Sequence, residues 1–469
     1  MPRSSIVNMR FVVLGPLAGL ALVACGGSAH LPVAAGIGPN PTLPPPDKSL
    51  IPTVNVAPAK GWPQGGKPRG PDGTSVVAFA SGLRHPRSIY VLPNGDVLVS
   101  ETNAPPKPED GKGVRGWFMK KAMKKAGAAA PTANRITLLR DSDGDHQADV
   151  REVLVSGLNS PFGMVLVGED LYVADTDALL RFRYKSGSTR IDGPGTKVVD
   201  LPAGPINHHW TKNVIANADG SLLYVTVGSN SNAAENGIEK ENERAAIWEV
   251  NPGTGQHRVF ASGLRNPVGL AWKPGSHELW TAVNERDELG SDLVPDYMTA
   301  VMDGGFYGWP YSYYGQHVDT RVTPPRPDLV ARAIPPSYAL GPHTASLGLA
   351  SSLGTTLPSR FHDGMFVGQH GSWNRKPYSG YKVIFVPFVG GSPHGDPVDV
   401  LTGFLTDGGE AQGRPVGVAI DKQGALLVAD DVGNTIWSGS ARAGAAASAS
   451  ASAPTALANQ ESHGSSSPG

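Results

Sequence analysis

The stretch GLRNPVGLAW, residues 263–272, occurs in similar form three more times, as GLRHP (82–86), GLNSPFG (157–163) and GRPVG (413–417). Each copy leads into a short apolar run, then a turn containing Gly, Asn or Asp, then a second apolar run. Two such runs joined by such a turn predict a β-hairpin. Weaker copies at 209–227 and 361–369 complete a set of six units.

The spacing of the units predicts the fold. Six units over about 365 residues give about 60 residues each, near the size of large β-propeller blades. No stretch with helical periodicity is long enough to build a parallel α/β sheet. We therefore predict an all-β fold, a six-bladed β-propeller over residues 74–440. A pair of β-sandwiches is the alternative, but it would not repeat one motif six times.

The N-terminus predicts export. Arg3 and Arg10 precede an apolar run at 11–24, which is shorter than the roughly 20 residues of a comfortable membrane span. The run ends at Cys25, the only cysteine, in a context that resembles a bacterial lipoprotein box. We expect residues 1–25 to be a lipoprotein signal, with Cys25 lipidated and the protein anchored to the cell envelope, in the periplasm or at the outer membrane. Ordinary secretory cleavage is the alternative.

Two further segments flank the predicted propeller. Residues 26–73 are rich in Pro and Gly, which predicts a disordered tether. Residues 441–469 are Ala/Ser repeats with little apolar bulk, which predicts a disordered tail.

Composition excludes several classes of function. The chain has 40 Lys and Arg against 41 Asp and Glu, so it lacks the basic excess of a nucleic-acid-binding protein. One cysteine excludes an intramolecular disulfide scaffold and zinc sites built from paired cysteines. No Gly-x-Gly-x-x-Gly follows a predicted strand, so a Rossmann nicotinamide site is disfavoured.

The repeated motif points to a site. It precedes the inner strand of each unit, so these loops should gather at one mouth of the central channel. His208 and His209 precede the strand at 214–216, and only one of two adjacent side chains can face the channel. A histidine there could act as a general base, and Arg265 could bind a carboxylate, as could Arg84 and Arg414 in matching places. Structural roles in the loops are the alternative for all of them.

Two acidic stretches could bind Ca²⁺. Asn284 and Glu285 begin an acidic loop after a predicted strand, and such loops supply oxygen ligands. The second stretch has the acidic spacing of a calcium loop, but its flanks predict strands and His146 replaces the required Gly, so it is not an EF-hand. Its acidic residues are Asp141, Asp143, Asp145, Asp149 and Glu152. In both cases an acidic turn without an ion is the alternative.

A basic insertion interrupts the first unit. Residues 107–125 carry several lysines around Trp117 and Phe118. Such a segment could contact a membrane surface or an electron acceptor, and a solvated insertion is the alternative.

Several motifs together resemble a known family. RNPVGLA (265–271), the acidic loop and GGFYGWP (304–310) resemble the soluble glucose/sorbosone dehydrogenases, which are six-bladed propellers that use pyrroloquinoline quinone (PQQ) and Ca²⁺. PFGM (161–164), ADTD (174–177) and FVGQHGSWN (366–374) resemble the sorbosone dehydrogenase branch. The resemblance implies an exported oxidoreductase that oxidises an aldose or sorbosone-like sugar by hydride transfer to the quinone, and an electron acceptor that the sequence does not identify.

The resemblance also implies roles for individual residues. His209 matches the catalytic base, and Arg265 and Asn266 match residues that contact PQQ. Arg414 matches an arginine that binds a PQQ carboxylate, and a fifth-blade cation is expected, to which we assign Lys382 with Arg375 and Lys376 as alternatives. Asn284 and Glu285 stand where the family's glucose enzymes have the Gly-Pro of the Ca²⁺ site. Ser229 stands where they have the Asp that orients the base.

Two rival functions belong to other classes. A calcium-dependent lactonase-type propeller would use Glu101, Asn103, Asn230 and Asp430 around one metal on the channel axis. A neutral lactone needs no arginine, however, and Arg265 therefore disfavours this function. A non-catalytic propeller that binds a partner at the cell envelope is the third hypothesis, since fold alone does not determine function.

Overall fold

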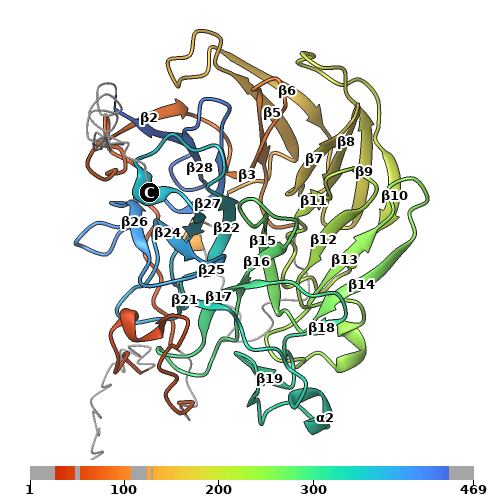
Figure 1. Ribbon diagram of the computed structural model, residues 1–469, viewed down its shortest axis with the longest axis vertical. Coiled ribbons are helices and arrows are strands. Elements are labelled where there is room, and N and C mark those ends of the chain that lie inside the picture. The colour runs from red at the N-terminus through yellow and green to blue at the C-terminus, as the bar shows by residue number, and fades with distance from the viewer. Residues whose placement is uncertain (1–26, 48–52, 107–123, 128–129, 443–469) are drawn as a thin grey trace, which may run out of the picture.

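The computed structural model describes residues 27–47, 53–106, 124–127 and 130–442. The signal with Cys25, most of the basic insertion and the tail from residue 443 lie outside these ranges. Six four-stranded antiparallel blades follow one another around a central channel, which confirms the predicted six-bladed β-propeller (Figure 1). Among the described residues no helix is long and apolar enough to cross a membrane.

The first three blades are formed consecutively along the chain. Blade one is β3 (Pro86–Val91), β4 (Val97–Glu101), β5 (Arg135–Arg140) and β6 (Val150–Ser156). Blade two is β7 (Met164–Val167), β8 (Asp170–Ala174), β9 (Ala178–Arg183) and β10 (Thr196–Asp200). Blade three is β11 (Val214–Ala216), β12 (Leu223–Val227), β13 (Ala246–Val250) and β14 (His257–Ser262), with β18 (Gly305–Phe306) added at its outer edge.

Of the other three blades, four and six contain strands from distant parts of the chain, whereas blade five is consecutive. Blade four is β15 (Asn266–Trp272), β16 (Leu279–Asn284), β17 (Pro295–Ala300) and β21 (Tyr338–Pro342), with β1 (Ile37–Gly38) outside β21. Blade five is β22 (Ser346–Ser351), β23 (Gly364–Gln369), β24 (Lys382–Val389) and β26 (Val398–Leu401), with β25 (Ser392–Pro393) on β24. Blade six is β27 (Pro415–Ile420), β28 (Leu426–Asp430), β29 (Thr435–Ala441) and β2 (Thr74–Ala80).

Short elements lie between these strands. They are the hairpin β19 (Ser312–Tyr313) and β20 (His317–Val318), the helix α2 (Pro327–Val330), and the 3₁₀ turns η1 (Val33–Gly36), η2 (Ile238–Glu241) and η3 (Ser359–Phe361).

The two ends of the propeller sequence close the ring. β2 pairs antiparallel with β29, from Thr74 opposite Ala441 to Ala80 opposite Ile436. The sixth blade therefore contains one strand from the start of the domain and three from its end. This pairing places both ends of the propeller sequence in one hydrogen-bonded sheet, so the sixth blade is complete.

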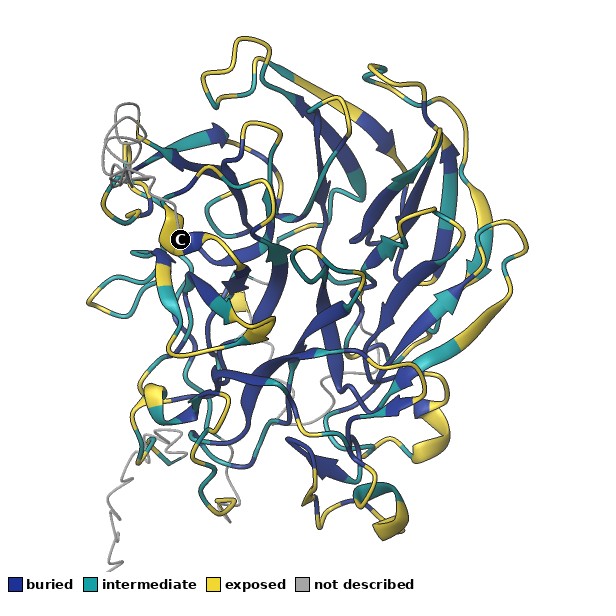
Figure 2. Ribbon diagram, viewed as in Figure 1, coloured by how far each residue is buried: buried dark blue, intermediate teal, exposed yellow. Residues whose placement is uncertain are grey.

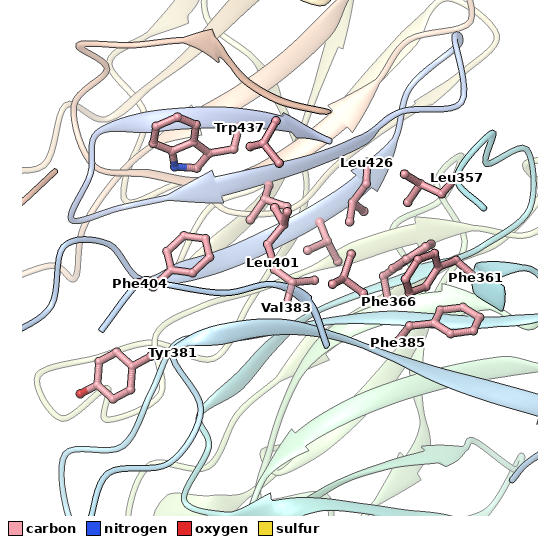
Figure 3. Packing of buried hydrophobic residues seen from close by; sticks show 14 of the residues in the cluster. Leu357, Phe361, Phe366, Tyr381, Val383, Phe385, Leu401, Phe404, Leu426 and Trp437 are labelled. Atoms are coloured by element: carbon pink, nitrogen blue, oxygen red, sulfur yellow. The ribbon is translucent and has the colours of Figure 1, made fainter. Parts of the chain in front are cut away.

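The core is divided among the interfaces between blades. Most strand residues are buried, whereas the connections at the rim are exposed (Figure 2). Between blades five and six, Phe361, Phe366, Phe385, Leu426 and Trp437 form part of one apolar cluster (Figure 3). Burial of side chains of this size contributes about 1.5–3 kcal/mol each, so the blade interfaces hold the ring together.

An apolar cluster, which we call the plug, lies among the inner strands. Phe162, Val268, Leu347 and Val416 come from four different blades, at or just before the start of the inner strand, and form one buried cluster. Two of them, Phe162 and Leu347, also line a pocket that is enclosed by the inner strands.

The segment before the propeller is ordered, so the prediction of a disordered tether at 26–73 is wrong for its described residues. We call residues 27–47 and 53–73 the strap. Its strand β1 pairs with β21, Ala57 is fully buried, and the Gly27 carbonyl accepts a hydrogen bond from Ser291 Oγ (2.7 Å). Pro and Gly disfavour a long α-helix here, but an extended chain can still satisfy its backbone groups on a neighbouring surface.

Candidate active site

The strand directions define where polar side chains meet. Each inner strand (β3, β7, β11, β15, β22 and β27) begins at one end of the channel, and the second strand of each blade ends there. We call this end the mouth. Residues just before an inner strand and just after a second strand therefore converge, although they are far apart in sequence.

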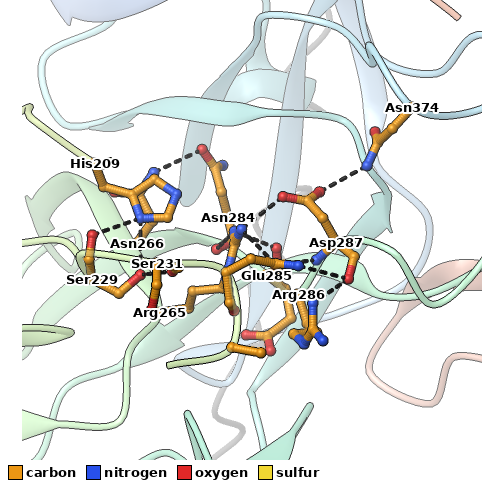
Figure 4. Close-up of polar contacts among 12 residues, drawn as sticks. His209, Ser229, Ser231, Arg265, Asn266, Asn284, Glu285, Arg286, Asp287 and Asn374 are labelled. Atoms are coloured by element: carbon orange, nitrogen blue, oxygen red, sulfur yellow. Dashed lines mark hydrogen bonds and ion pairs between the residues drawn. The ribbon is translucent and has the colours of Figure 1, made fainter. Parts of the chain in front are cut away.

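His209 lies at the mouth, held by Ser229. Its Nδ1 is 2.9 Å from Ser229 Oγ and 3.0 Å from the Ser229 carbonyl oxygen (Figure 4). Ser229 Oγ donates its own proton to the Ser231 carbonyl (2.6 Å), so it can only accept from His209. Nδ1 therefore carries the proton, and the lone pair lies on Nε2, which is the tautomer that a general base requires.

The loop that carries Ser229 is held in place by the carboxylate of Glu241. The Glu241 carboxylate accepts hydrogen bonds from the Asn230 backbone N–H (2.7 Å) and from Ser231 Oγ. Burial raises the pKa of Glu241, while these two hydrogen bonds oppose the rise. The hydrogen-bonded carboxyl thus holds the orienting serine in place.

Arg265 binds the acidic loop. Its buried guanidinium donates to the carbonyl oxygens of Asn284 (3.3 Å) and Glu285 (2.6 Å) and pairs with Asp287 (2.7 Å) (Figure 4). The carbonyls predicted to hold Ca²⁺ therefore do converge on a positive charge. In this structure the guanidinium of Arg265 supplies that charge.

Asp287 was not predicted, and it is central to the cluster. Its carboxylate also accepts a hydrogen bond from Asn374 Nδ2 (2.8 Å) and lies 3.6 Å from His343 Nδ1. Burial opposes ionisation, but Arg265 and the contacts with His343 outweigh it and lower the pKa of Asp287. A fixed negative charge therefore stands at the mouth beside Arg265.

Asn266 lies beside this cluster. Its Nδ2 is 3.3 Å from Asn284 Oδ1, while its buried Oδ1 has no hydrogen-bond partner among the described residues. Unpartnered buried polar atoms are rare in folded proteins and require an explanation. A bound molecule at the mouth would provide one.

A second charged cluster surrounds Asp431, at the end of β28. Its carboxylate pairs with Arg87 (2.6 Å) and His370 (2.9 Å), and His85 lies 3.8 Å away. Burial, together with the charges of Arg414 and Arg87, lowers the pKa of His370 to about 4, so His370 is neutral at pH 7 and donates from Nε2. These residues were not predicted as a group because they come from three blades.

Arg414 reaches the edge of the second cluster. It lies over the Tyr381 ring, at 4.9 Å from its centroid, and donates to the strap carbonyl of Ala57 (3.3 Å). The buried Nε atoms of Arg414 and Arg87 have no hydrogen-bond partner among the described residues. Each of these arginines therefore has an Nε–H group at the mouth that is available to donate a hydrogen bond.

The assignment of Lys382 as a cofactor ligand needs correction. Its Nζ pairs with Asp399 of β26 (2.6 Å), on the outer side of blade five. Arg375, an alternative, is fully buried but donates to the carbonyls of Pro377 and Leu31. The fifth-blade side chains that do reach the mouth are His370 and Asn374, which belong to the motif at 366–374 but were not predicted as site residues.

The predicted calcium loop lies elsewhere. It connects β5 to β6 at the end of the blade opposite the mouth. Oxygen atoms of Asp141, Asp143 and Asp149 lie within 4.8 Å of one another, but Asp145 and Glu152 do not join them. Asp145 instead accepts hydrogen bonds from Gln147.

The residues proposed for a lactonase metal are engaged in separate contacts. Glu101 pairs with Arg135, and Asp430 accepts from the Trp62 and Trp437 indoles. Asn103 Nδ2 donates to the Ala130 carbonyl. The Asn230 side chain has a buried Oδ1 without a partner among the described residues. These contacts do not define a shared metal site.

Fold and site together define a six-bladed propeller with a histidine, a buried arginine and an aspartate at one mouth of its channel. The sequence model of the TrAA12-like family matches residues 68–295 and 328–438, so the chain belongs to this family.

Named relatives agree with the earlier resemblance. The chain is 24% identical over 358 residues to a pyrroloquinoline quinone-dependent pyranose dehydrogenase of Coprinopsis cinerea, covering 67% of this chain and 44% of that protein. It spans 44–62% of the length of its curated relatives.

Solved structures show the same fold. The holo PQQ domain of the Coprinopsis cinerea pyranose dehydrogenase superposes with a TM-score of 0.62 at 20% identity, covering 82% of this chain and all of that domain. The calcium structure of a Trichoderma reesei family AA12 enzyme gives 0.64 at 18% identity, covering 83% and 99%. The resemblance to PQQ-dependent sugar dehydrogenases is thus confirmed, whereas the sorbosone branch stays a prediction.

Proposed function

We propose that this protein is an exported, PQQ- and Ca²⁺-dependent dehydrogenase that oxidises an aldose or sorbosone-like sugar and is anchored by a lipid on Cys25. One observation carries the dehydrogenase proposal: His209 is held by Ser229 as a base, beside Arg265 and Asn266. The family, and the PQQ-dependent relatives within it, support the same conclusion.

The mouth fits PQQ chemically. PQQ carries three carboxylates, which require cationic or N–H donors. Arg87 and Arg414 offer buried Nε donors without partners, and Asn266 offers a buried Oδ1 that can accept a hydrogen bond. We assign these three residues to the quinone, with Arg265 fixing the loop beside it.

The acidic loop fits Ca²⁺. The carbonyl oxygens of Asn284 and Glu285 and the carboxylate of Asp287 are hard oxygen ligands that already share one cation, Arg265. When bound, the quinone supplies a two-electron acceptor and Ca²⁺ a Lewis acid. His209 takes the hydroxyl proton of the substrate at Nε2, and Ser229 keeps the ring oriented while it does so.

Calorimetric titration of PQQ into the purified protein, with and without Ca²⁺, tests the proposal. We expect tight binding only when Ca²⁺ is present, and dye-linked oxidation of at least one sugar in a panel of aldoses and sorbosone. Absence of PQQ binding together with absence of dye reduction would remove it. Hydrolysis of a lactone without PQQ would support the rival class instead.

A further inference from the structure

The described chain begins on the mouth side of the propeller. The Gly27 carbonyl accepts hydrogen bonds from Ser291 Oγ (2.7 Å) and Thr53 Oγ1 (3.0 Å). Ser291 lies in the loop that leaves β16 and enters β17, and both strands have that end at the mouth. The first described residue is therefore attached to the mouth side of blade four.

The residues that follow are attached as well. The backbone N–H groups of His30 and Leu31 donate to the Asp292 carboxylate (2.6 and 3.2 Å), and that of Ala29 donates to the Lys376 carbonyl (2.7 Å). Arg375 donates to the Leu31 carbonyl (3.0 Å). Four of the first five described residues, Gly27, Ala29, His30 and Leu31, are thus held by blades four and five.

This attachment adjoins the candidate active site. The carbonyl of Gly290, next to Ser291, accepts from His343 Nε2 (2.8 Å), and His343 Nδ1 lies 3.6 Å from Asp287. Only the loop at Gly290 and Ser291 and the side chain of His343 therefore lie between the start of the strap and Asp287 at the mouth.

Covalent geometry limits where a lipid on Cys25 can lie. Cys25 precedes Gly27 by two residues, which span at most about 7 Å. Most blade strands have five to seven residues, which puts the opposite face of the propeller about 20 Å from the mouth. An anchor on Cys25 therefore reaches the mouth side and does not reach the other face.

We propose that the mouth side is the surface that faces the bilayer, a conclusion that rests on the proposed acylation of Cys25. The exposed Lys124 and Lys125 support it. They lie in the connection between β4 and β5, whose two ends are at the mouth, and the Lys125 carbonyl accepts from the strap residue Ala59 (2.9 Å). Lysines on this side favour anionic lipid headgroups.

The orientation has a chemical consequence. Sugar must enter through the space between the mouth and the headgroups, while an electron acceptor dissolved in the bilayer lies next to the site. The proposed dehydrogenase would then reduce a lipid-soluble acceptor, rather than a soluble carrier that approaches from the opposite side.

Lipid-quenched fluorescence tests the orientation. The full chain is produced in a bacterial host, acylation is checked by mass spectrometry of the N-terminal peptide, and the protein is placed in phosphatidylethanolamine/phosphatidylglycerol vesicles containing brominated lipids. Acylated Cys25 has no free thiol, so Lys376→Cys at the mouth and Lys422→Cys in the turn between β27 and β28 each give one labelling site; both lysines are exposed. We expect the label at 376 to be quenched and the label at 422 to be unaffected.

The controls separate the anchor from the orientation. An N-terminal peptide without acyl groups overturns the anchor and this inference with it, while PQQ binding still reports on the dehydrogenase. Acylated protein with equal quenching at both labels overturns the orientation alone. A 20-residue Gly/Ser spacer inserted after Gly26, with an end-to-end distance of about 25 Å, should abolish the difference between the labels. A difference that survives the spacer would show that the short attachment is not its cause.

Discussion

His209 is oriented by the hydroxyl and the carbonyl oxygen of Ser229, the position at which the resemblance implies an aspartate. Ser229 fixes the ring but carries no charge to stabilise the imidazolium that forms during proton transfer. His209→Gln should lower turnover by about 10²–10⁴-fold, the usual contribution of a positioned base, and leave PQQ binding nearly unchanged. Dye-linked turnover and calorimetry measure the two effects separately.

The neighbouring histidine is the matched control. His208 is exposed, and its ring meets that of His209 edge-on, with centroids 4.8 Å apart. His208→Gln should therefore change turnover by no more than a few-fold. If His208→Gln were the inactive variant, the two histidines would have exchanged roles. Activity in both variants would rule out a histidine base.

Arg265 and Asp287 form an ion pair whose arginine is 2% exposed. Asp287→Asn keeps the shape but leaves the guanidinium without its counter-charge. Because the substitution leaves a buried charge without a counter-charge, we expect the free energy of unfolding to fall by about 3 kcal/mol. Urea denaturation measures this. Asp303→Asn, which removes an exposed partner of Arg258, should have little effect, and equal losses would contradict the prediction.

Asp175 predicts a dependence of stability on pH. Burial raises its pKa to about 7, and its Oδ1 has no partner among the described residues. The unfolded carboxyl has a pKa of about 3.9, so between pH 4 and 7 the folded state holds a proton that the unfolded chain has lost. Raising the pH through this window therefore lowers stability.

Asp175→Asn removes this titration. The stability of the variant relative to the parent should be more favourable at pH 8 than at pH 5, measured by thermal unfolding at both values. Asp407→Asn, at an exposed position, should show the same difference from the parent at both pH values. A parallel response of Asp175→Asn and parent would show that Asp175 ionises normally.

Sequence motifs located part of the site. The motif before each inner strand led to His209, Arg265, Asn266 and Arg414, and the structure brings all four to the mouth. The carboxylates between them, Asp287 and Asp431, were missed because only the arrangement of blades shows which arginine each one faces. Their shared position, just after a second strand, was a signal available in the sequence.

At the scale of elements, the inner strands are packed too closely for side chains at some positions. A Cβ on Gly348 of β22 would overlap the carbonyl oxygen of Val416 on β27. Gly348→Ala should therefore destabilise the protein by about 1–3 kcal/mol, the usual range for overpacking against backbone. Gly408→Ala, in open space apart from Thr406 Oγ1 at 3.7 Å, is the control for urea denaturation. Equal stability of both variants would mean that β22 can shift.

The hairpins of the blades were predictable because each contains its own pattern of alternation and its own turn. The strap was not, since its partners lie on blades four to six and its composition only disfavours a long α-helix. The same limit applies to Lys382: sequence places it on blade five, but the outer strand β26 supplies its partner, Asp399. Local pattern identifies elements, and non-local contacts decide what their side chains touch.

At the scale of the molecule, the number of blades followed from the count of repeats. The ring closes because β2 pairs with β29, and the paired residues are about 360 positions apart in the sequence. A local sequence pattern cannot predict a pairing over this distance. The propeller therefore positions the mouth through the whole ring, and five of the six blades contribute a residue to the site.

The plug formed by Phe162, Val268, Leu347 and Val416 has a kinetic consequence. Because these apolar side chains narrow the channel next to the mouth, we expect sugar, oxidised product and electron acceptor all to reach the site through the mouth, one after another. Plots of reciprocal rate against reciprocal sugar concentration at several acceptor concentrations should therefore be parallel lines. At high concentration, each substrate should also inhibit the reaction by competing with the other substrate for the mouth. Intersecting lines would mean that both bind together, by separate routes.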